Sequence, residues 1–133
     1  MVSESITTGY TTTATCGTPS STTIPCFKPL NQVTRQAVAA FLYRLTDAAN
    51  DPSYTPPTSQ LFTDVSPGHT FYAEIQWMAA RHIDEGFTAG CTTAPCYQST
   101  SNETRGRLIT SLYNTATAPA AWHDPPPSNA LTF

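Results

Sequence analysis

The chain has 133 residues, a net charge of -3 and only 11% charged residues, well below the quarter or so that is usual in soluble domains. Its length predicts one domain, or two small repeats that share a core. The absence of a basic patch argues against nucleic acid as a partner, and the Thr, Ser and Pro in place of charged residues favour an extracellular surface over a cytosolic enzyme.

The N-terminal segment predicts no targeting signal. Its start, Met1-Val2-Ser3-Glu4-Ser5, lacks the basic and apolar regions of a signal peptide. No stretch approaches the ~20 apolar residues of a transmembrane helix, so we expect no membrane insertion. Two origins fit: a fragment of a larger secreted protein, or a complete protein that leaves the cell by another route, such as a virion protein released by lysis. Residues 1–33 are rich in Thr, Ser and Gly, which predicts loop with at most one short strand.

A first helix is predicted from Thr34, whose hydroxyl can accept a free N–H of the first turn. Apolar residues then follow with the spacing of one helix face, at Val38, Phe41, Leu42 and Leu45. We expect this helix to end near Ala48 to Asn50, before the Asp51-Pro52 pair. Residues 51–61 carry three prolines and predict a linker.

Two further helices are expected. One runs from about Gly68 to His82 and has an apolar face formed by Phe71, Ile75, Met78 and Ala79. The other starts at Thr104, again a capping Thr, and carries Leu108, Ile109 and Leu112 on one face. From residue 115 on, the chain is rich in Ala and Pro and predicts an extended tail, in which Trp122 and Phe133 are the large apolar anchors.

The four cysteines fall into two local pairs, Cys16 with Cys26 and Cys91 with Cys96. Four cysteines allow three connectivities, and we expect the two local disulfides because each would close a short loop of small and polar residues. The alternative is a zinc site, for which the spacings are too wide and the histidines too scattered. We therefore predict disulfides and no bound metal or cofactor.

The sequence contains an internal repeat. The segment from Cys26 to Arg35 aligns with the segment from Cys96 to Arg105, and both place Thr-Arg at the same distance after an aromatic residue that follows Cys. Both run into an amphipathic helix with a Leu-Tyr pair near its end, and upstream Gly9-Tyr10 matches Gly86-Phe87. Each unit is too small to bury its own apolar face, so the copies are expected to pack together.

This pattern resembles the S-layer homology (SLH) family, in the variety found on actinobacterial surface proteins. The second copy of the repeat carries Phe62-Thr63-Asp64-Val65, then His69, then Phe71 to Ala79 with Trp77, and continues through Ile83, Gly86-Phe87 and Thr104-Arg105. The first copy supplies only the second half of the repeat, from Gly9-Tyr10 through Phe27-Lys28-Pro29 to the helix at Thr34-Arg35. Together they amount to about one and a half repeats.

The resemblance implies a mainly α fold and noncovalent binding of cell-wall polysaccharide, often pyruvylated, in grooves between repeats. By position, Arg35 and Arg105 would bind the glycan. A guanidinium can donate two parallel hydrogen bonds to a carboxylate, and a helix N-terminus favours an anion. Tyr10 and Phe87 would supply a stacking face for a sugar. The alternative for the two arginines is that they pair with nearby carboxylates.

The sequence also departs from the family. Ala37 and Arg107 stand where the family usually has Glu, and cysteine loops replace its acidic turn. His82 stands where a Gly usually ends the helix; His can adopt the left-handed conformation at some cost. One and a half repeats do not complete a three-repeat binding unit, so either copies of the chain assemble or only the scaffold is kept.

Catalytic motifs are missing from the sequence. It has no GxSxG, HExxH, P-loop or dinucleotide motif. A hydrolase with paired carboxylates would have to use Asp64, Glu74, Asp84 or Glu85, which lie on a small frame without an obvious cleft. We expect Trp77 in the core, His69 bonded to backbone near a helix start, and Asp64 accepting backbone N–H groups in the turn before the helix. The chain is therefore predicted not to be an enzyme.

The sequence thus predicts a half repeat at 1–50, a linker at 51–61, a full repeat at 62–114 and a tail at 115–133. We expect an extracellular attachment module that binds cell-envelope glycan. The alternative is a virion protein, a capsid decoration or tail-associated subunit of a phage infecting an actinobacterium. Its partners would be cell-wall polysaccharide or neighbouring subunits, including further copies of itself, at a cell or virion surface.

Overall fold

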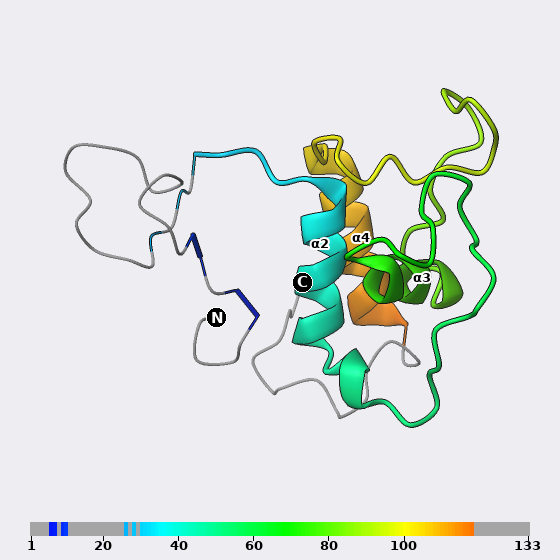
Figure 1. Cartoon of the computed structure of the whole chain (residues 1–133). Helices are drawn as coiled ribbons and strands as arrows, with labels where there is room; N and C mark the ends of the chain where they lie inside the picture. Colours follow the sequence, from blue (N-terminus) through cyan, green and yellow to red (C-terminus); the bar gives the residue numbers. More distant parts are fainter. Residues whose placement is uncertain (1–5, 8, 11–25, 27, 29, 119–133) are drawn as a thin grey trace. The chain divides into compact units, whose positions relative to one another are not determined.

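A computed structural model describes residues 6, 7, 9, 10, 26, 28 and 30–118. Within these residues the elements are three α-helices, α2 (Arg35–Leu45), α3 (Tyr72–Ala80) and α4 (Arg105–Thr117), and a short 3-10 helix, η1 (Ala48–Asn50) (Figure 1). Extended backbone in the described part pairs only in isolated bridges. The expected mainly α class is confirmed at this level. The chain divides into two compact units, Met1–Gln32 and Val33–Phe133.

The start of α2 differs in one respect from the expectation. Thr34 is the N-cap residue, as predicted, and has extended backbone, but its side chain makes no capping hydrogen bond. Backbone carbonyls take that role instead: the N–H of Arg35 donates to Ser101 O at 2.9 Å and the N–H of Gln36 to Ser99 O at 2.9 Å. The helix therefore begins against a distant segment of chain, which a local sequence pattern does not reveal.

The end of α2 comes earlier than expected, at Leu45 rather than near Ala48 to Asn50. The Thr46 hydroxyl donates to Leu42 O at 3.0 Å, and Asp47 adopts left-handed backbone with φ 54°. A left-handed residue interrupts the helical hydrogen-bond ladder, so the following residues form the separate turn η1. The prolines downstream are thus not what stops the helix.

The helix α3 is shorter than the predicted range from Gly68 to His82. Turns occupy the residues before Tyr72, and the N–H of Phe71 donates to His69 Nδ1 at 3.1 Å, which confirms that His69 bonds to backbone near the helix start. The last helical residue is Ala80, and His82 has left-handed backbone with φ 54°. His82 thus ends the helix in the conformation that a Gly usually supplies.

The core of the second unit lies where α2 packs against α3. Trp77 is fully buried, as predicted, and its ring meets Tyr43 of α2 edge to face at 5.6 Å between centroids. The other fully or nearly fully buried apolar side chains include Val38, Ala39, Leu42, Phe62, Val65, Ile75, Met78, Ile83 and Tyr97. Burial of this set provides the main driving force for folding the unit.

Helices α2 and α4 lie beside each other and begin at the same end of the unit (Figure 1). An antiparallel bridge joins Thr34 and Asn102 just before the two helices, and the N–H of Glu103 donates to Val33 O at 2.7 Å. The second Thr-Arg pair behaves as expected, because the Thr104 hydroxyl accepts the N–H of Arg107 at 3.3 Å. The two Thr-Arg segments are therefore neighbours in space.

A turn built on Gly9 is found in the first unit. Gly9 has φ 68°, and its N–H donates to Thr7 Oγ1 at 3.3 Å. Tyr10 then pairs with Cys26 through two backbone hydrogen bonds of 2.8 and 3.0 Å. The positive φ accounts for glycine at this position.

The same turn recurs in the second unit. Gly86 has φ 74°, its N–H donates to Asp84 Oδ1 at 2.9 Å, and Phe87 pairs with Cys96 through two backbone hydrogen bonds of 2.8 and 3.0 Å. A Cβ on Gly86 would lie 2.5 Å from Cys96 O, so this turn has no room for a side chain. The aligned segments thus share a backbone conformation and a hydrogen-bond pattern.

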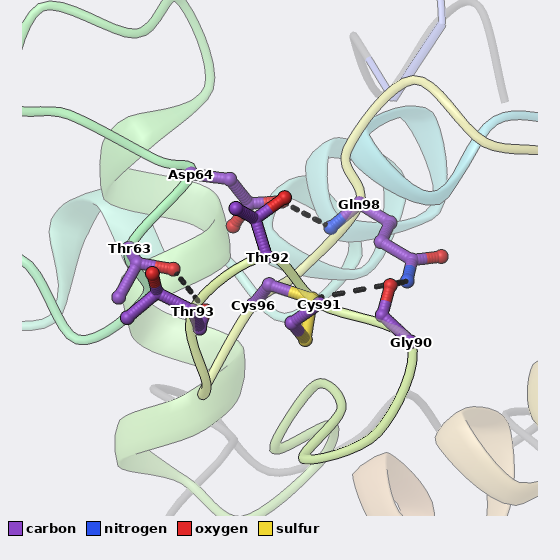
Figure 2. Close-up of a pocket in the computed structure, with 8 residues that line it drawn as sticks. All are labelled: Thr63, Asp64, Gly90, Cys91, Thr92, Thr93, Cys96 and Gln98. Atoms are coloured by element: carbon purple, nitrogen blue, oxygen red, sulfur yellow. Dashed lines mark hydrogen bonds between the residues drawn. A yellow bond between two sulfur atoms is a disulfide. The ribbon is translucent and has the colours of Figure 1, made fainter.

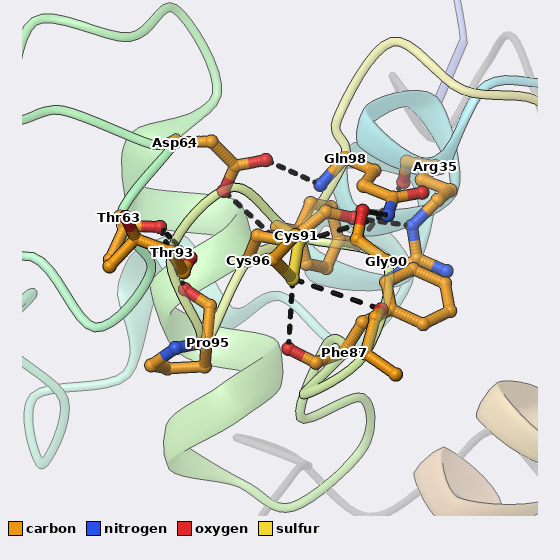
Figure 3. Close-up of a disulfide and its surroundings, with 12 residues drawn as sticks. Arg35, Thr63, Asp64, Phe87, Gly90, Cys91, Thr93, Pro95, Cys96 and Gln98 are labelled. Atoms are coloured by element: carbon orange, nitrogen blue, oxygen red, sulfur yellow. Dashed lines mark hydrogen bonds between the residues drawn. A yellow bond between two sulfur atoms is a disulfide. The ribbon is translucent and has the colours of Figure 1, made fainter.

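The disulfide between Cys91 and Cys96 is present, with a Cα–Cα distance of 5.8 Å, which confirms this predicted pair. Its Cys91 Sγ lies 3.4 Å from the Phe87 carbonyl oxygen, so the bridge holds the loop beside the Gly-aromatic turn (Figure 3). Cys16, and the tail with Trp122 and Phe133, lie outside the described residues. No helix in the described ranges has the length and apolar character needed to cross a membrane.

Candidate functional site

Arg35, one of the two arginines predicted to bind glycan, is buried at the start of α2. Only 1% of its surface is exposed. Its Nε donates to Tyr97 O at 2.6 Å, and its terminal nitrogens lie 3.1 Å from Asp84 Oδ2 and 3.5 Å from Glu103 Oε2. The guanidinium is thus engaged by one carbonyl and two carboxylates.

A second arginine completes this group of charges. Arg107 Nη2 lies 2.6 Å from Asp84 Oδ1, and its Nε lies 3.7 Å from Glu103 Oε1. Two cations and two anions therefore form a neutral cluster, which we call the arginine cluster (Arg35, Asp84, Glu103, Arg107). Both carboxylate side chains are almost fully buried, and Asp84 also accepts the N–H of Gly86. The cluster joins the starts of α2 and α4 to the turn that follows α3.

Two aromatic rings line the arginine cluster. The guanidinium carbons of Arg35 and Arg107 lie 4.3 and 4.2 Å from the centroid of Phe87, and that of Arg35 lies 4.6 Å from the centroid of Tyr97. These are distances typical of cation–π contacts. With two guanidinium groups over it, the Phe87 ring offers little open face for a sugar. Figure 3 shows this ring beside Arg35.

The Tyr97 hydroxyl lies deep in the same region, where it donates to Arg35 O at 3.2 Å. Burial raises the pKa of this hydroxyl well above its usual range, and the nearby Asp84 carboxylate raises the pKa further while Arg35 opposes the change. The neutral phenol is therefore the form that the fold keeps. Its role in the unit is to hold the start of α2.

For Arg35, the structure shows the alternative raised by the sequence, which is pairing with carboxylates. A buried ion pair is held by its geometry, and removing one partner leaves an uncompensated charge in a low-dielectric interior. Without opening this end of the unit, a glycan carboxylate has no route to Arg35. The side chain therefore acts within the fold of the second unit.

Arg105 has a different environment, although the alignment makes it the counterpart of Arg35. It is the first residue of α4 and is exposed. Within the described residues, no acceptor is bonded to the N–H of Arg105 or of Gly106, whereas the matching N–H groups in α2 bond to carbonyls. A cationic side chain and free N–H groups thus face outward at the same helix end, where an anion is favoured.

The predicted stacking residue Tyr10 belongs to the first unit. The residue is 39% exposed, and Lys28 Nζ lies 5.2 Å from the centroid of its ring. Of the four residues predicted to bind glycan, the structure brings Arg35 and Phe87 into contact, while Arg105 stands apart at the start of α4. Of these four residues, Tyr10 therefore carries an exposed ring and Arg105 an exposed cationic group.

A pocket of about 340 Å³ lies beside the disulfide (Figure 2). Asp64 lines it, and both oxygens of its carboxylate accept backbone N–H groups, from Tyr97 and Gln98, each at 2.7 Å. The expectation that Asp64 accepts backbone N–H bonds is confirmed, but the donors come from a loop far along the chain rather than from the adjacent turn. Because this carboxylate is committed to the backbone, the pocket is poorly suited to acid–base chemistry.

Two further carboxylates of the hydrolase alternative, Asp84 and Glu85, also have partners. Asp84 belongs to the arginine cluster, and Glu85 lies 2.6 Å from His82 Nδ1 on the surface. Among the residues that the structure describes, no group of His, Cys, Asp and Glu is arranged to hold a metal ion.

Sequence reasoning missed the arginine cluster. Arg107 enters the sequence analysis only as a departure from the family pattern, yet Glu103 and Arg107 are four residues apart, a spacing that favours an ion pair on a helix. Asp84 was considered as an acid catalyst rather than as the partner of two arginines. No local pattern could connect Arg35 with Asp84, because 49 residues separate them.

The sequence matches no family model, and the comparisons with curated proteins and with solved structures also found no match.

Proposed function

We propose that this chain is a non-catalytic extracellular attachment module that binds an acidic cell-envelope glycan at the start of α4. The observation that carries the proposal is the contrast between two aligned arginines. Arg35 is buried and neutralised, whereas Arg105 is exposed beside backbone N–H groups that no described residue accepts. The binding residue of the second unit is therefore Arg105, with its N–H and that of Gly106.

The chemistry suits a carboxylate such as a ketal-linked pyruvate or a uronic acid. A guanidinium donates two parallel N–H bonds to the two oxygens of a carboxylate, which gives direction as well as charge attraction. Free N–H groups at a helix start add further donors and a partial positive charge. Arg107, the next cation along α4, is held by Asp84 and Glu103 and does not compete for the ligand.

The local geometry supports the further proposal that the two segments are SLH-like repeats. Gly9-Tyr10 and Gly86-Phe87 share a positive φ at glycine and the same pair of backbone bonds to a cysteine. Thr34 and Thr104 both precede their helices with extended backbone, at ψ 157° and 153°. Two short local geometries therefore recur in the aligned segments, which supports a repeated module of the kind that an attachment protein would use.

A structural virion protein is the second candidate. The observation in its favour is the outward side of α4, where Ile109 and Tyr113 are exposed and no charged residue occurs from Leu108 to Thr117. Such a face suits contact with another protein subunit. Adjacent capsid or tail genes would favour this candidate, and a flanking cell-wall hydrolase gene would count against it.

The glycan proposal is tested by sedimentation with purified actinobacterial cell walls. Wild-type chain is expected to pellet with the walls, Arg105→Ala to stay in solution, and Arg44→Ala, which removes an exposed arginine at the other end of α2, to pellet like wild type. Walls whose carboxylates have been reduced to alcohols should lose the wild-type chain. Equal pelleting of wild type and Arg105→Ala, or no pelleting of wild type, would refute the proposal.

A further inference from the structure

The outward face of α4 has an unusual composition for an exposed helix. It is formed by Gly106, Ile109, Thr110, Tyr113 and Thr117, all exposed. Ile109 is 64% and Tyr113 58% exposed. From Leu108 to Thr117 the helix carries no charged residue, whereas a solvent-facing helix surface usually carries several. We call this surface the α4 outer face.

The corresponding face of α2 is covered by another helix. By the alignment, Ala39, Ala40 and Tyr43 match Ile109, Thr110 and Tyr113. Ala39 and Ala40 are buried, and Tyr43 packs on Trp77 of α3. The same positions that α2 uses for helix–helix packing are thus exposed on α4. A helix is therefore the kind of partner that this face fits.

The α4 outer face is also complementary to itself. A Cβ placed on Gly106 meets nothing within 4 Å, so the helix has a notch there. Tyr113 projects from the same face about two turns further along. If two α4 helices pack antiparallel about a twofold axis near Ile109 and Thr110, each Tyr113 lies over the Gly106 of the other copy. The twofold symmetry then forms this contact between a large side chain and a notch twice.

The charges favour the same arrangement. The N-terminal end of α4 is positive, from its N–H groups and from Arg105, and the C-terminal end carries partial negative charge on its last carbonyls. An antiparallel pair places each positive end beside the negative end of the other copy. A parallel pair would bring the two Arg105 side chains together.

We propose that two copies of this chain associate through the α4 outer face, antiparallel, with Tyr113 of each copy seated over Gly106 of the other. The contact goes beyond the proposed glycan site and borders on it, because the glycan would take the backbone N–H of Gly106 whereas Tyr113 of the other copy would take the open space at its Cα. A single helix pair is a small interface, below about 1,200 Å². The dimer is therefore expected to be weak and to depend on concentration.

Analytical ultracentrifugation of the full chain tests the proposal. Wild type should change from monomer to dimer as its concentration rises through the micromolar range. Gly106→Leu, which fills the notch but leaves the monomer without a clash, should stay monomeric with unchanged or higher stability to urea. Tyr113→Ser should weaken the dimer at least about tenfold, and Leu61→Ser, which removes an exposed apolar side chain elsewhere, should not.

The contrary results are distinct. A wild-type chain that stays monomeric at all concentrations would overturn the proposal, whether the face is then open or covered by another segment or protein. A dimer that Gly106→Leu leaves intact would place the contact elsewhere and would overturn it equally. Tyr113→Ser should still pellet with cell walls as a monomer, so failure of the dimer and failure of the glycan proposal give different outcomes.

Discussion

Arg35 and Asp84 form an ion pair of 3.1 Å across 49 residues of sequence, and both side chains are almost entirely buried. The pair ties the first residue of α2 to the turn that follows α3. The same Asp84 also bonds to Arg107 near the start of α4. One carboxylate thus connects all three helical segments of the second unit.

Removal of this arginine should strongly destabilise the fold. Arg35→Ala would leave Asp84 and Glu103 buried with one cation fewer, and breaking a buried ion pair in this way typically costs about 3–5 kcal/mol. Urea unfolding followed by circular dichroism measures the loss.

The matched variant is Arg105→Ala, at the position that the sequence alignment pairs with Arg35. Because Arg105 is exposed, its removal should change the free energy of unfolding by less than about 0.5 kcal/mol. Similar losses in Arg35→Ala and Arg105→Ala would contradict the division of roles between the two arginines.

Gly86→Ala should be among the most damaging small substitutions. The new Cβ would approach Cys96 O at 2.5 Å and Phe62 Cε1 at 2.6 Å, at a φ of +74°. Left-handed backbone costs a non-glycine residue about 1–2 kcal/mol, and overpacking adds about 1–3 kcal/mol. Gly68→Ala is the control, since its Cβ meets nothing within 4 Å. A thermal melt that shows equal effects for the two variants would mean that the turn is not as tight as described.

Loss of the disulfide should weaken the fold without abolishing it. The paired change of Cys91→Ser and Cys96→Ser opens a short loop, for which chain entropy predicts a loss of about 2 kcal/mol. The bridge lies beside Phe87, which lines the arginine cluster, so hydrogen exchange should accelerate at the amides of Phe87 and Cys96. Unchanged exchange at both amides would argue against a role for the bridge in holding this turn.

Stability should fall at alkaline pH. Burial raises the pKa values of Tyr97 and Tyr54 in the fold above the ordinary value of 10.0. Above pH 10 the unfolded chain therefore loses these protons while the folded chain keeps them, and the free energy of unfolding drops by about 1.4 kcal/mol per pH unit for each tyrosine. Below pH 10 this contribution is fully present and constant. Urea unfolding from about pH 8 to pH 11 checks the slope, which Tyr97→Phe should reduce; a slope unaffected by Tyr97→Phe would contradict this account.

Much of the local structure could be predicted from the sequence. The three helices, the capping role of Thr104, the burial of Trp77 and the Cys91–Cys96 pair all follow from patterns within a few residues. The helix boundaries were less accurate. The prolines downstream suggest a later end for α2 than the structure shows. The helix ends where the Thr46 hydroxyl donates to Leu42 O and Asp47 adopts left-handed backbone.

The site was harder to predict, because it depends on contacts between distant segments. The alignment treated Arg35 and Arg105 alike, since both follow Thr at the same place in a repeat. Only the fold shows that α2 begins against the loop of residues 96–103, whose acceptors and rings enclose Arg35, while no described segment encloses Arg105 in the same way. The two aligned motifs thus acquire different environments because only the start of α2 lies against the loop of residues 96–103.

The most direct test of the division between the two arginines is a backbone NMR titration with a carboxylated cell-wall fragment. The account predicts that the amide signals of Arg105 and Gly106 shift most, because their N–H groups have no acceptor in the described structure. The amides of Arg35 and Gln36, already bonded to Ser101 and Ser99, should stay in place. Shifts at Arg35 and Gln36 without shifts at Arg105 and Gly106 would contradict it.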